Sequence, residues 1–600
     1  MKLRKKLPLL LTALVITGAM VFSCEGPEGP EGPQGETGTQ GASSLISLAT
    51  EPAGDNCEKG GFKITVGIDT NGNGTLDADE ITGTAYACNG DTGDSGLSFL
   101  INTSEEPAGD NCQFGGFKIE AGLDENENGT LDEAEITQTD YLCNGVSSTT
   151  LGALATVFPD FSAVTVTPLI SSLDELPTSN GEQFILGGSA DGAGMILNPT
   201  TGNYELMVNC EDHYSVARIT LNADLKPIKG DYMLNSGVSD VSRQCSGTMW
   251  EAAIHGGDRD LFISSSETFN YTSRGIDPLD VPNPTEQNHL AAFGQFAWEN
   301  NVPLPQVAYP GKTVVVGGDD DSDDETAYGQ VAMYMSESGD ADLTNGKVYV
   351  LRMEGATGPS DEGDIAFGTE YAVEFVEIEG GADLTLAEMG QASLDSNAFQ
   401  FMRVEDLDYG KGSAAANRIV YFAVTGRGPG RGTFNDWGTG YKLVLDENNP
   451  LKGKMTQIIS GNTDSNNMDG NISLLQSPDN ICVTENFIYW QEDPNSFDRN
   501  HQAYIWQTDL NGDNAAALLQ IDINEGLNPE GETFSGEFGA MFDISDKVGE
   551  EGTFILCLQP HYWVNSMFEG VDGHFNYGNA NGSREDDQGS QLVILRNVPR

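Results

Sequence analysis

The segment YELMVNCED, residues 204–212, is the first of a series of short apolar or alternating stretches that each end on a polar group. Five more follow: DLFISSSE (260–267), KTVVVGGDD (312–320), RIVYFAVTG (418–426), NFIYWQED (486–493) and TFILCLQPH (553–561). Their polar ends lie 52 to 69 residues apart, except for one interval of 106 that leaves room for a further element, EYAVEFVEI (370–378). Such spacing is typical of β-propeller blades, whose inner strands point their ends into one channel. We therefore predict a propeller over residues 150–600, with a stacked sandwich as the alternative.

The composition favours an all-β chain and excludes nucleic acid as a partner. The 600 residues include 73 glycines and 25 prolines, which favour many turns and short strands over long helices. The chain has 29 basic and 92 acidic residues and a net charge of −63, so nothing would neutralise the phosphates of a nucleic acid. The acidity has two compatible interpretations: a solvated, repulsive surface, or sites that bind cations.

The N-terminus predicts export and lipid anchoring. A basic stretch, MKLRKK, precedes an apolar run that is too short and too early for a membrane-spanning anchor. It ends in Val21-Phe22-Ser23-Cys24, which resembles the lipobox of bacterial lipoproteins and predicts a signal peptide over 1–23 with lipidation of Cys24. An ordinary signal peptide with an incidental cysteine is the alternative. We expect a monomeric lipoprotein anchored to the outer membrane, on its periplasmic or cell-surface face, that touches the membrane only through this lipid.

Three small regions follow the signal. Residues 26–41 have glycine at every third position, which predicts a collagen-like, extended stalk over 24–45. A module at 46–95 is then repeated at 96–148, and each copy has two cysteines 31 positions apart. Because so small a module buries little apolar surface, we expect β-hairpins stapled by the disulfides Cys57–Cys88 and Cys112–Cys143.

Each module carries the spacing of an EF-hand calcium loop, with oxygen ligands at positions 1, 3, 5, 7 and 9, glycine at 6 and glutamate at 12. The candidate ligands are Asp69, Asn71, Asn73, Thr75, Asp77 and Glu80, and Asp124, Asn126, Asn128, Thr130, Asp132 and Glu135. The flanking GFKITVGI alternates like a strand, and no helix precedes the loop. We predict calcium-stiffened hairpins; turns built by Asn and Gly without a metal are the alternative.

The four remaining cysteines divide into two kinds. Cys210, Cys482 and Cys557 lie in apolar, strand-like runs, where a small thiol packs well in a core. Cys245 lies in RQCSGT, a polar turn in which a thiolate would be reachable. A metal ligand is one use for such a thiolate, and a disulfide to one of the other three is the alternative.

Seven segments resemble the PhoX family of bacterial alkaline phosphatases in order and spacing. They are YELMVNCEDHYSVARITLN, the turn with Cys245, FGQFAWEN, KTVVVGGDDD, QFMRVEDLDY, SPDNICVTENFIYWQED and FILCLQPH. The resemblance covers residues 160–600 and none of the N-terminal modules. It implies a six-bladed propeller that hydrolyses phosphate monoesters, with iron(III) and calcium ions in the central channel.

The resemblance also implies a role for particular residues. Cys245 matches a cysteine whose thiolate binds iron, and Arg403 matches an arginine that contacts phosphate. The metal ligands implied are Glu299, Glu405 and Asp479, with Glu267 in SSSE as a weaker candidate. The chain departs from the family at Trp298, where histidine is usual, at Asn480, where glycine is usual, and at His561 in QPH.

This set of residues is chemically reasonable for a phosphatase. Carboxylates and one thiolate suit calcium and iron(III), two facing cations stabilise the oxygens of an in-line phosphoryl transfer, and an arginine offers a bidentate fork. We therefore expect a phosphatase acting on small-molecule phosphate esters. The alternatives are a non-catalytic cell-surface binding or adhesion lipoprotein, and a propeller phosphodiesterase or lactonase. Weaker candidates are Arg427 or Arg431, in the glycine-rich TGRGPGRG, which is otherwise an ordinary turn, and Asp319, which begins an acidic run.

Overall fold

The computed structural model describes residues 43–51, 54, 61–69, 81–88, 99–106, 116–124, 126, 128–143, 151–238, 242–267, 272–286, 288–321, 327–428, 434–464, 470–494, 499, 501–528, 536–574 and 587–600. They divide into two compact units, residues 1–99 with 123–130 and residues 100–122 with 131–600. No helix in the described part of the chain is long and apolar enough to cross a membrane. The signal sequence, Cys24 and the stalk through residue 42 lie outside the described residues.

The N-terminal repeat forms two three-stranded sheets. One has the order β1 (Ser43–Glu51), β2 (Gly61–Asp69), β3 (Ile81–Cys88), and the other β4 (Phe99–Glu106), β5 (Gly116–Leu123), β6 (Ile136–Cys143). Each sheet therefore has one strand more than the predicted hairpin. Cys57 and Cys112 lie outside the described residues, as do the side chains of Cys88 and Cys143, so both disulfides stay predictions.

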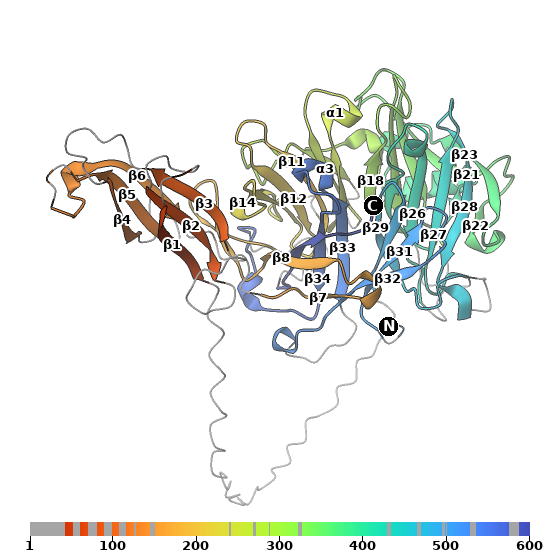
Figure 1. The fold of residues 1–600 in the computed structure, drawn as a ribbon. Helices are drawn as coiled ribbons and strands as arrows, with labels where there is room; N and C mark the ends of the chain where they lie inside the picture. Colours follow the sequence, from red (N-terminus) through yellow and green to blue (C-terminus); the bar gives the residue numbers. More distant parts are fainter. Residues whose placement is uncertain are drawn as a thin grey trace, which may run out of the picture. The chain divides into compact units, whose positions relative to one another are not determined.

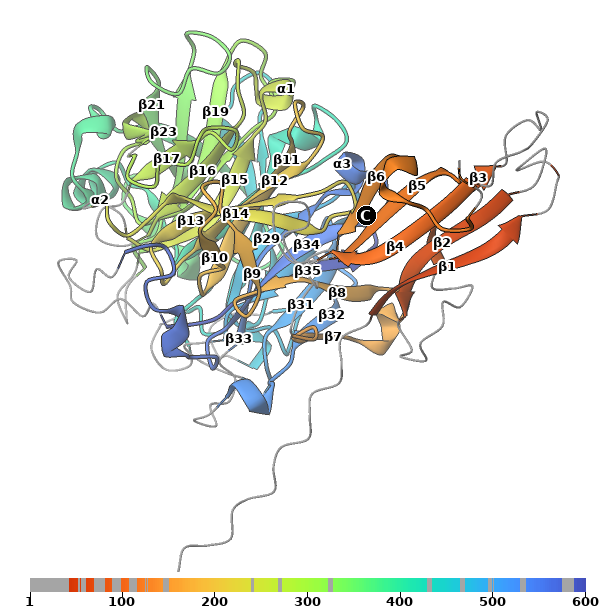
Figure 2. The same ribbon diagram turned by 90° about the vertical axis from the view of Figure 1, so that its left-hand side faces the viewer.

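Residues 155–596 form antiparallel meanders that succeed one another along the chain. The first is β11 (Ala190–Leu197), β12 (Tyr204–Cys210), β13 (Ser215–Leu221) and β14 (Pro227–Leu234). The second is β15 (Gln244–Trp250), β16 (Leu261–Ser266) and β17 (Ser273–Ile276). A small pair, β9 (Glu175–Pro177) and β10 (Gln183–Ile185), precedes them and is labelled in Figure 2.

Two further meanders share one nine-stranded sheet. They are β18 (Trp298–Pro303), β19 (Thr313–Asp319), β20 (Val331–Ser336) and β21 (Lys347–Met353), and β25 (Val404–Tyr409), β26 (Ile419–Val424), β27 (Thr439–Leu445) and β28 (Lys452–Ser460). Strand β23 (Glu370–Glu377) lies between β21 and β28 and joins the outer edges (Figure 1). The segment EYAVEFVEI is thus the further element predicted in the long interval, and it forms β23, an outer strand that joins two meanders.

The last two meanders are completed by strands from the start of this region. One is β29 (Pro478–Val483), β30 (Phe487–Glu492), β31 (Tyr504–Asp509), β32 (Ala516–Ile521) and then β7 (Ala155–Val157). The other is β33 (Gly536–Asp543), β34 (Phe554–Pro560), β35 (Gln591–Arg596) and then β8 (Thr165–Ser171), visible side by side in Figure 2. Helices are short: α1 (Ala252–His255), α2 (Leu386–Asp395) and α3 (Ser545–Val548). A parallel pair, β22 (Ser360–Asp361) and β24 (Phe399–Gln400), completes the described strands.

The first strands of the meanders surround a common axis. Strands β11, β15, β18, β25, β29 and β33 each contact the next, and β33 contacts β11 again. Apolar side chains fill the space between neighbouring sheets; Val208 and Ile219 of one sheet share a buried cluster with Ile555 and Leu592 of another. The chain is therefore nearly all β with a propeller-like arrangement, which confirms the predicted fold class.

The apolar stretches that predicted the fold are the second strands of the meanders, β12, β16, β19, β26, β30 and β34, and their assignment as inner strands is wrong. They are buried along nearly their whole length because a sheet packs against each of their faces, so they read as continuous apolar runs. Several inner strands begin with small and polar residues, as in ADGAG (190–194) and QCSGT (244–248), which hides them in the sequence.

Candidate metal centre

Each inner strand places a side chain able to bind a metal at its second residue. These residues are Asp191 of β11, Cys245 of β15, Glu299 of β18, Glu405 of β25, Asp479 of β29 and Glu537 of β33. In the first five strands the pairing with the second strand has a bulge at this point. A bulge turns a side chain out of the alternation of the strand, and here it repeats around the axis.

The second strands contribute another set of residues from just beyond their last residue. In antiparallel pairs the end of the second strand lies beside the start of the inner strand. The residues delivered in this way are Glu211 and Asp212 after β12, Glu267 after β16, Asp320 after β19, Arg427 after β26, Asp493 after β30 and His561 after β34.

Both sets of residues line one cavity of about 300 Å³, together with Arg243, Arg403 and Gln588. Ten of the lining side chains are carboxylates, and Cys245 adds a thiol, against three arginines and one histidine. Like charges at this density repel strongly in a medium of low dielectric constant. The cavity is therefore an unfavourable arrangement for the chain alone and a favourable one for bound cations.

Several of these residues lie close enough to share an ion. Within each of the groups Asp191–Cys245–Glu299, Glu211–Cys245–Glu267, Glu299–Glu405–Asp479 and Asp479–Asp493–Glu537, the ligand atoms are within 4.8 Å of one another. The groups have members in common, so they form a continuous cluster. Asp479 Oδ1 is buried and accepts no hydrogen bond from any described residue, which is rare for a carboxylate oxygen unless another ligand satisfies it.

Two arginines are fixed by carboxylates of the same cavity. Arg403 Nε lies 2.7 Å from Asp320 Oδ1, and its Nη2 lies 2.8 Å from Glu405 Oε1. Arg243 reaches Glu211 at 3.0 Å, Asp212 at 3.3 Å and Glu267 at 3.6 Å. Within the described residues, Arg403 Nη1 donates no hydrogen bond, which leaves this nitrogen for a ligand.

Burial dominates the protonation of the acidic groups. Desolvation raises the pKa of Asp191, Glu299, Glu405 and Asp479 well above their ordinary values, and neighbouring carboxylates add to the rise. Desolvation also raises the pKa of Glu267, to about 7, with Asp320 as the next cause. These groups can all be ionised together only where positive charge offsets them.

The thiol of Cys245 follows the same physics. Burial, followed by Glu211, Glu267 and Glu299, raises its pKa well above the ordinary value, so without a cation it stays protonated. His561 is held protonated by its carboxylate neighbours. Burial is the largest single influence and lowers its pKa, but the hydrogen bond from its Nε2 to Glu537 Oε2, at 2.9 Å, and the charges of Glu537, Asp212 and Asp493 together outweigh burial and raise the pKa to about 10.

The structure brings all six predicted site residues of the propeller region together. Cys245, Glu267, Glu299, Arg403, Glu405 and Asp479 line the same cavity. Cys245 is a free cysteine, as are Cys210, Cys482 and Cys557, so the disulfide alternative for Cys245 is wrong. The other three are buried as expected, and Cys482 faces a separate cavity of about 880 Å³.

The weaker candidates differ in whether they line the cavity. Arg427 lines the cavity, whereas Arg431 lies outside the described residues. Asp319 is buried and accepts a hydrogen bond from Ala297 N at 2.8 Å, and it is its neighbour Asp320 that reaches the cavity. Of the departures from the PhoX pattern, His561 lines the cavity, while Trp298 packs in a core against Phe296.

Sequence reasoning missed about half of the lining residues. Asp191 and Glu537 belong to no segment that stands out by itself, whereas Arg243 and Asp493 lie in the quoted segments RQCSGT and NFIYWQED but were given no role. A usable signal was nevertheless present. Several of the apolar second strands are preceded by a short segment with an acid or cysteine before small or polar residues, as in ADGAG (190–194) and QCSGT (244–248).

The second calcium loop is described in part, and the first lies outside the described residues apart from the backbone of Asp69. The Asp124 carboxylate accepts hydrogen bonds from Asn128 N at 3.0 Å and Gly129 N at 2.8 Å, and Gly129 has a φ of 79°. Further along, Glu135 Oε2 accepts from Asp132 N at 3.0 Å. These bonds fit a calcium loop and an Asx-rich turn equally well, so calcium binding here stays a prediction.

Comparison with known proteins adds the following. A family described as a domain of unknown function, DUF7151, matches residues 43–88 and again residues 99–143. No curated protein gives a match. Among solved structures, the PQQ-bound aldose sugar dehydrogenase of Streptomyces coelicolor is 14% identical over 72% of this chain and 98% of its own, with a TM-score of 0.28. A putative 6-phosphogluconolactonase of Bacteroides fragilis is 11% identical over 81% and 97%, with a TM-score of 0.25. With TM-scores this low, neither structure informs the function of this chain.

Proposed function

We propose that the chain is a metal-dependent phosphatase that hydrolyses phosphate monoesters, with the cavity as its active site. The observation that carries the proposal is the meeting of a thiol, a cluster of buried carboxylates and Arg403 in one small cavity. Neither part suffices alone, because a phosphate ester would be repelled by the carboxylates and a cation site alone would have no reason to include a guanidinium.

The residues present fit calcium and iron(III). Cys245, with Asp191 and Glu299, offers the one soft ligand and two hard ones expected for an iron(III) site. Glu299, Glu405 and Asp479 offer only oxygens, which is the ligand type that calcium prefers. Bound there, the cations would neutralise charge on the phosphoryl group and activate the attacking oxygen.

The chain's own residues would bind and orient the substrate. Asp320 and Glu405 hold the guanidinium plane of Arg403, so that its remaining nitrogen, Nη1, can donate to a phosphate oxygen without further loss of side-chain freedom. Arg243 and Arg427 add positive charge to the walls of the same cavity. Burial of the carboxylates excludes water, which strengthens each of these interactions.

We also propose that the fold is a six-bladed propeller. This description treats the nine-stranded sheet as two blades joined by β23, and it is supported by the six first strands that contact one another around the axis. The lipobox-like leader supports export and anchoring at the outer membrane, with the enzyme acting as a monomer.

The test is hydrolysis of p-nitrophenyl phosphate by the protein without its signal sequence, supplied with calcium and iron(III) and then treated with chelator. We expect activity that chelation abolishes and that Cys245→Ala loses. Cys482→Ala is the matched control, since Cys482 is also a buried free thiol but faces the other cavity.

Absence of turnover in folded, metal-loaded protein would contradict the proposal and favour the binding or adhesion lipoprotein. Turnover of phosphodiesters or lactones in place of monoesters would keep the metal centre and change the substrate class. Equal loss of activity in the two cysteine variants would show that the thiol at Cys245 has no special role.

A further inference from the structure

Glu362 is a buried carboxylate that lies outside the cavity and belongs neither to the candidate metal ligands nor to the arginines that would bind phosphate. It begins the short 3-10 helix Glu362–Asp364 and has no exposed surface. The preceding strand, β22, pairs in parallel with β24, which ends directly before Phe401. This pairing places the carboxylate beside the chain that leads into Arg403.

Hydrogen bonds from four residues satisfy this carboxylate. Oε2 accepts from Met402 N at 2.9 Å, and Oε1 accepts from Thr439 Oγ1 at 2.8 Å and from Tyr441 OH at 2.7 Å. Asn435 Nδ2 lies 3.2 Å from Oε1 and 3.3 Å from Oε2. Within the described residues no cation pairs with it, so burial raises its pKa although each of these bonds opposes the rise.

Two of the four donors are linked to the cavity arginines, one through the chain and the other through a hydrogen bond. Met402 directly precedes Arg403, and Met402 O accepts from Gly426 N at 3.0 Å. Asn435 O accepts from Arg427 N at 3.2 Å. One buried carboxylate therefore holds both the chain before Arg403 and the chain opposite Arg427.

The backbone at Arg403 needs such support. Its φ is 73°, in the left-handed region that a side chain with a Cβ rarely occupies. A residue in this region keeps its conformation only when its surroundings determine it. Around Arg403 these determinants are the bond from Met402 N to Glu362 and the bond from Thr425 N to Arg403 O, at 3.1 Å.

We propose that Glu362 is a positioning residue: from outside the cavity it fixes the backbone of Arg403 and Arg427 and so sets the affinity of the site for a phosphate group. This inference rests on the proposed function, in which Arg403 contacts phosphate. Glu362 itself touches neither substrate nor metal ligand in the described residues.

The variant that tests this is Glu362→Gln. It keeps the shape of the side chain but replaces an acceptor oxygen with a donor NH2, which must face Met402 N or the cluster of hydroxyl and amide donors. We expect the Kd for inorganic phosphate, measured by calorimetry on metal-loaded protein, to rise about tenfold, the shift that loss of one good hydrogen bond produces. The KM for p-nitrophenyl phosphate should rise by a similar factor, with kcat changed less.

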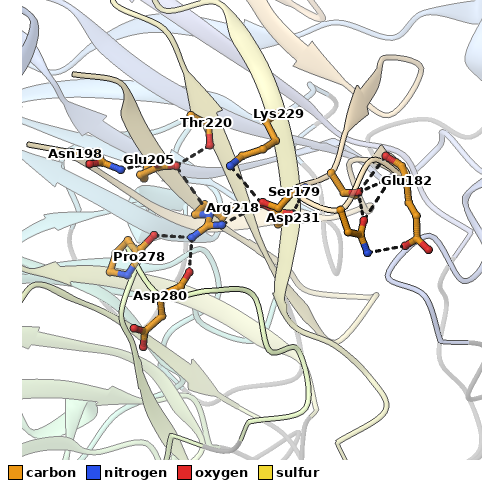
Figure 3. A network of polar contacts seen from close by, with 12 residues as sticks. Ser179, Glu182, Asn198, Glu205, Arg218, Thr220, Lys229, Asp231, Pro278 and Asp280 are labelled. Atoms are coloured by element: carbon orange, nitrogen blue, oxygen red, sulfur yellow. Dashed lines mark hydrogen bonds and ion pairs between the residues drawn. The ribbon is translucent and has the colours of Figure 1, made fainter. Parts of the chain in front are cut away.

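A matched control is Glu205→Gln. Glu205 of β12 is also buried, and it accepts from Thr220 Oγ1 at 2.7 Å and Asn198 Nδ2 at 3.0 Å (Figure 3). It does not line the cavity. We expect this variant to lose stability while its phosphate Kd and KM stay at the wild-type values. An equal rise of Kd in both variants would overturn the proposal, because it would reveal a general effect of destabilisation.

Two measurements separate this proposal from the proposed function. In hydrogen exchange, the amides of 401–403 and 425–427 should exchange faster in Glu362→Gln and unchanged in Glu205→Gln, whether or not the protein hydrolyses anything. Wild-type protein that binds phosphate without turnover would overturn the phosphatase alone. Unchanged exchange and unchanged Kd in Glu362→Gln would overturn the positioning role alone. If Glu362→Gln does not fold, Tyr441→Phe, which removes one of the donors, is judged by the same criteria with an expected threefold rise in Kd.

Discussion

Replacing Glu267 with glutamine should stabilise the metal-free protein at alkaline pH. The carboxyl is largely buried, with 12% of its side chain exposed, and burial together with Asp320 raises its pKa from 4.5 to about 7. One pKa unit corresponds to about 1.4 kcal/mol, so ionising this group in the folded chain costs about 3 kcal/mol above pH 8. The neutral amide of Glu267→Gln has no such cost.

The difference in stability between Glu267→Gln and wild type depends on pH. Below pH 4 the carboxyl is protonated in the folded and unfolded chains, so wild type and variant should have the same stability. Between about pH 4.5 and 7 the unfolded chain releases its proton first, and the folded wild type loses stability as the pH rises. The gain from the substitution should therefore be absent at pH 4 and complete at pH 8.

The assay is thermal unfolding by calorimetry in chelator at pH 4 and pH 8. Glu447→Gln, at an exposed glutamate, is the control and should change little. With calcium and iron(III) in place of chelator, wild type should become the more stable protein. It keeps the Glu267 carboxylate as a metal ligand, and the variant does not. If Glu267→Gln is no more stable than wild type at pH 8 in chelator, the idea that the cavity holds unfavourable buried charge is wrong.

Three other outcomes follow from contacts described above. Arg403→Lys should raise the KM for p-nitrophenyl phosphate about tenfold or more, because a single ammonium nitrogen cannot be held by Asp320 and Glu405 and also present a separate, fixed donor to phosphate; an unchanged KM in steady-state assays would contradict the role of the guanidinium. Leu556→Ala, at a fully buried position of β34, should cost about 2–5 kcal/mol of stability, and a Tm equal to that of wild type would contradict the packing. Asp124→Ala removes the acceptor of two loop amides, so calorimetric titration should find one calcium site fewer per chain, and an unchanged stoichiometry would favour the metal-free turn.

The sequence predicts the strands of this fold better than their places in it. The stretch TFILCLQPH becomes β34 and KTVVVGGDD becomes β19, because a strand buried on both faces must be apolar throughout. Their order within the sheets depends on which neighbours cover them, and this is a property of the whole assembly. The inner strand β29 begins Pro478-Asp479-Asn480, a sequence typical of a turn, and only the bulge opposite Glu492 makes it the edge of a cavity.

The candidate site, like the fold, could be predicted from the sequence only in part. Cys245 could be singled out in advance from its polar surroundings, although the predicted turn is wrong, because the residue lies buried in β15. Arg403 could be singled out only through the resemblance to the PhoX family. Asp191 could not, because an aspartate beside two glycines has the appearance of an ordinary turn. What identifies it is its distance of at most 4.8 Å from the ligand atoms of Cys245 and Glu299, and no local pattern encodes that distance.

Because β8 pairs with β35, the fold can be completed only when the C-terminal strand is available. Strand β8, residues 165–171, lies beside 591–596, so the first and last segments of this region meet in one sheet. The loop that must close between them spans nearly the whole region, and Glu537 of β33, which completes the group with Asp479 and Asp493, comes only near the end of the chain. A chain exported from its N-terminus would thus cross the membrane with its acidic residues still dispersed, and would assemble the centre only on the side where it finishes folding. Loss of the final ten residues would remove the partner of β8 and leave an open ring in place of a closed one.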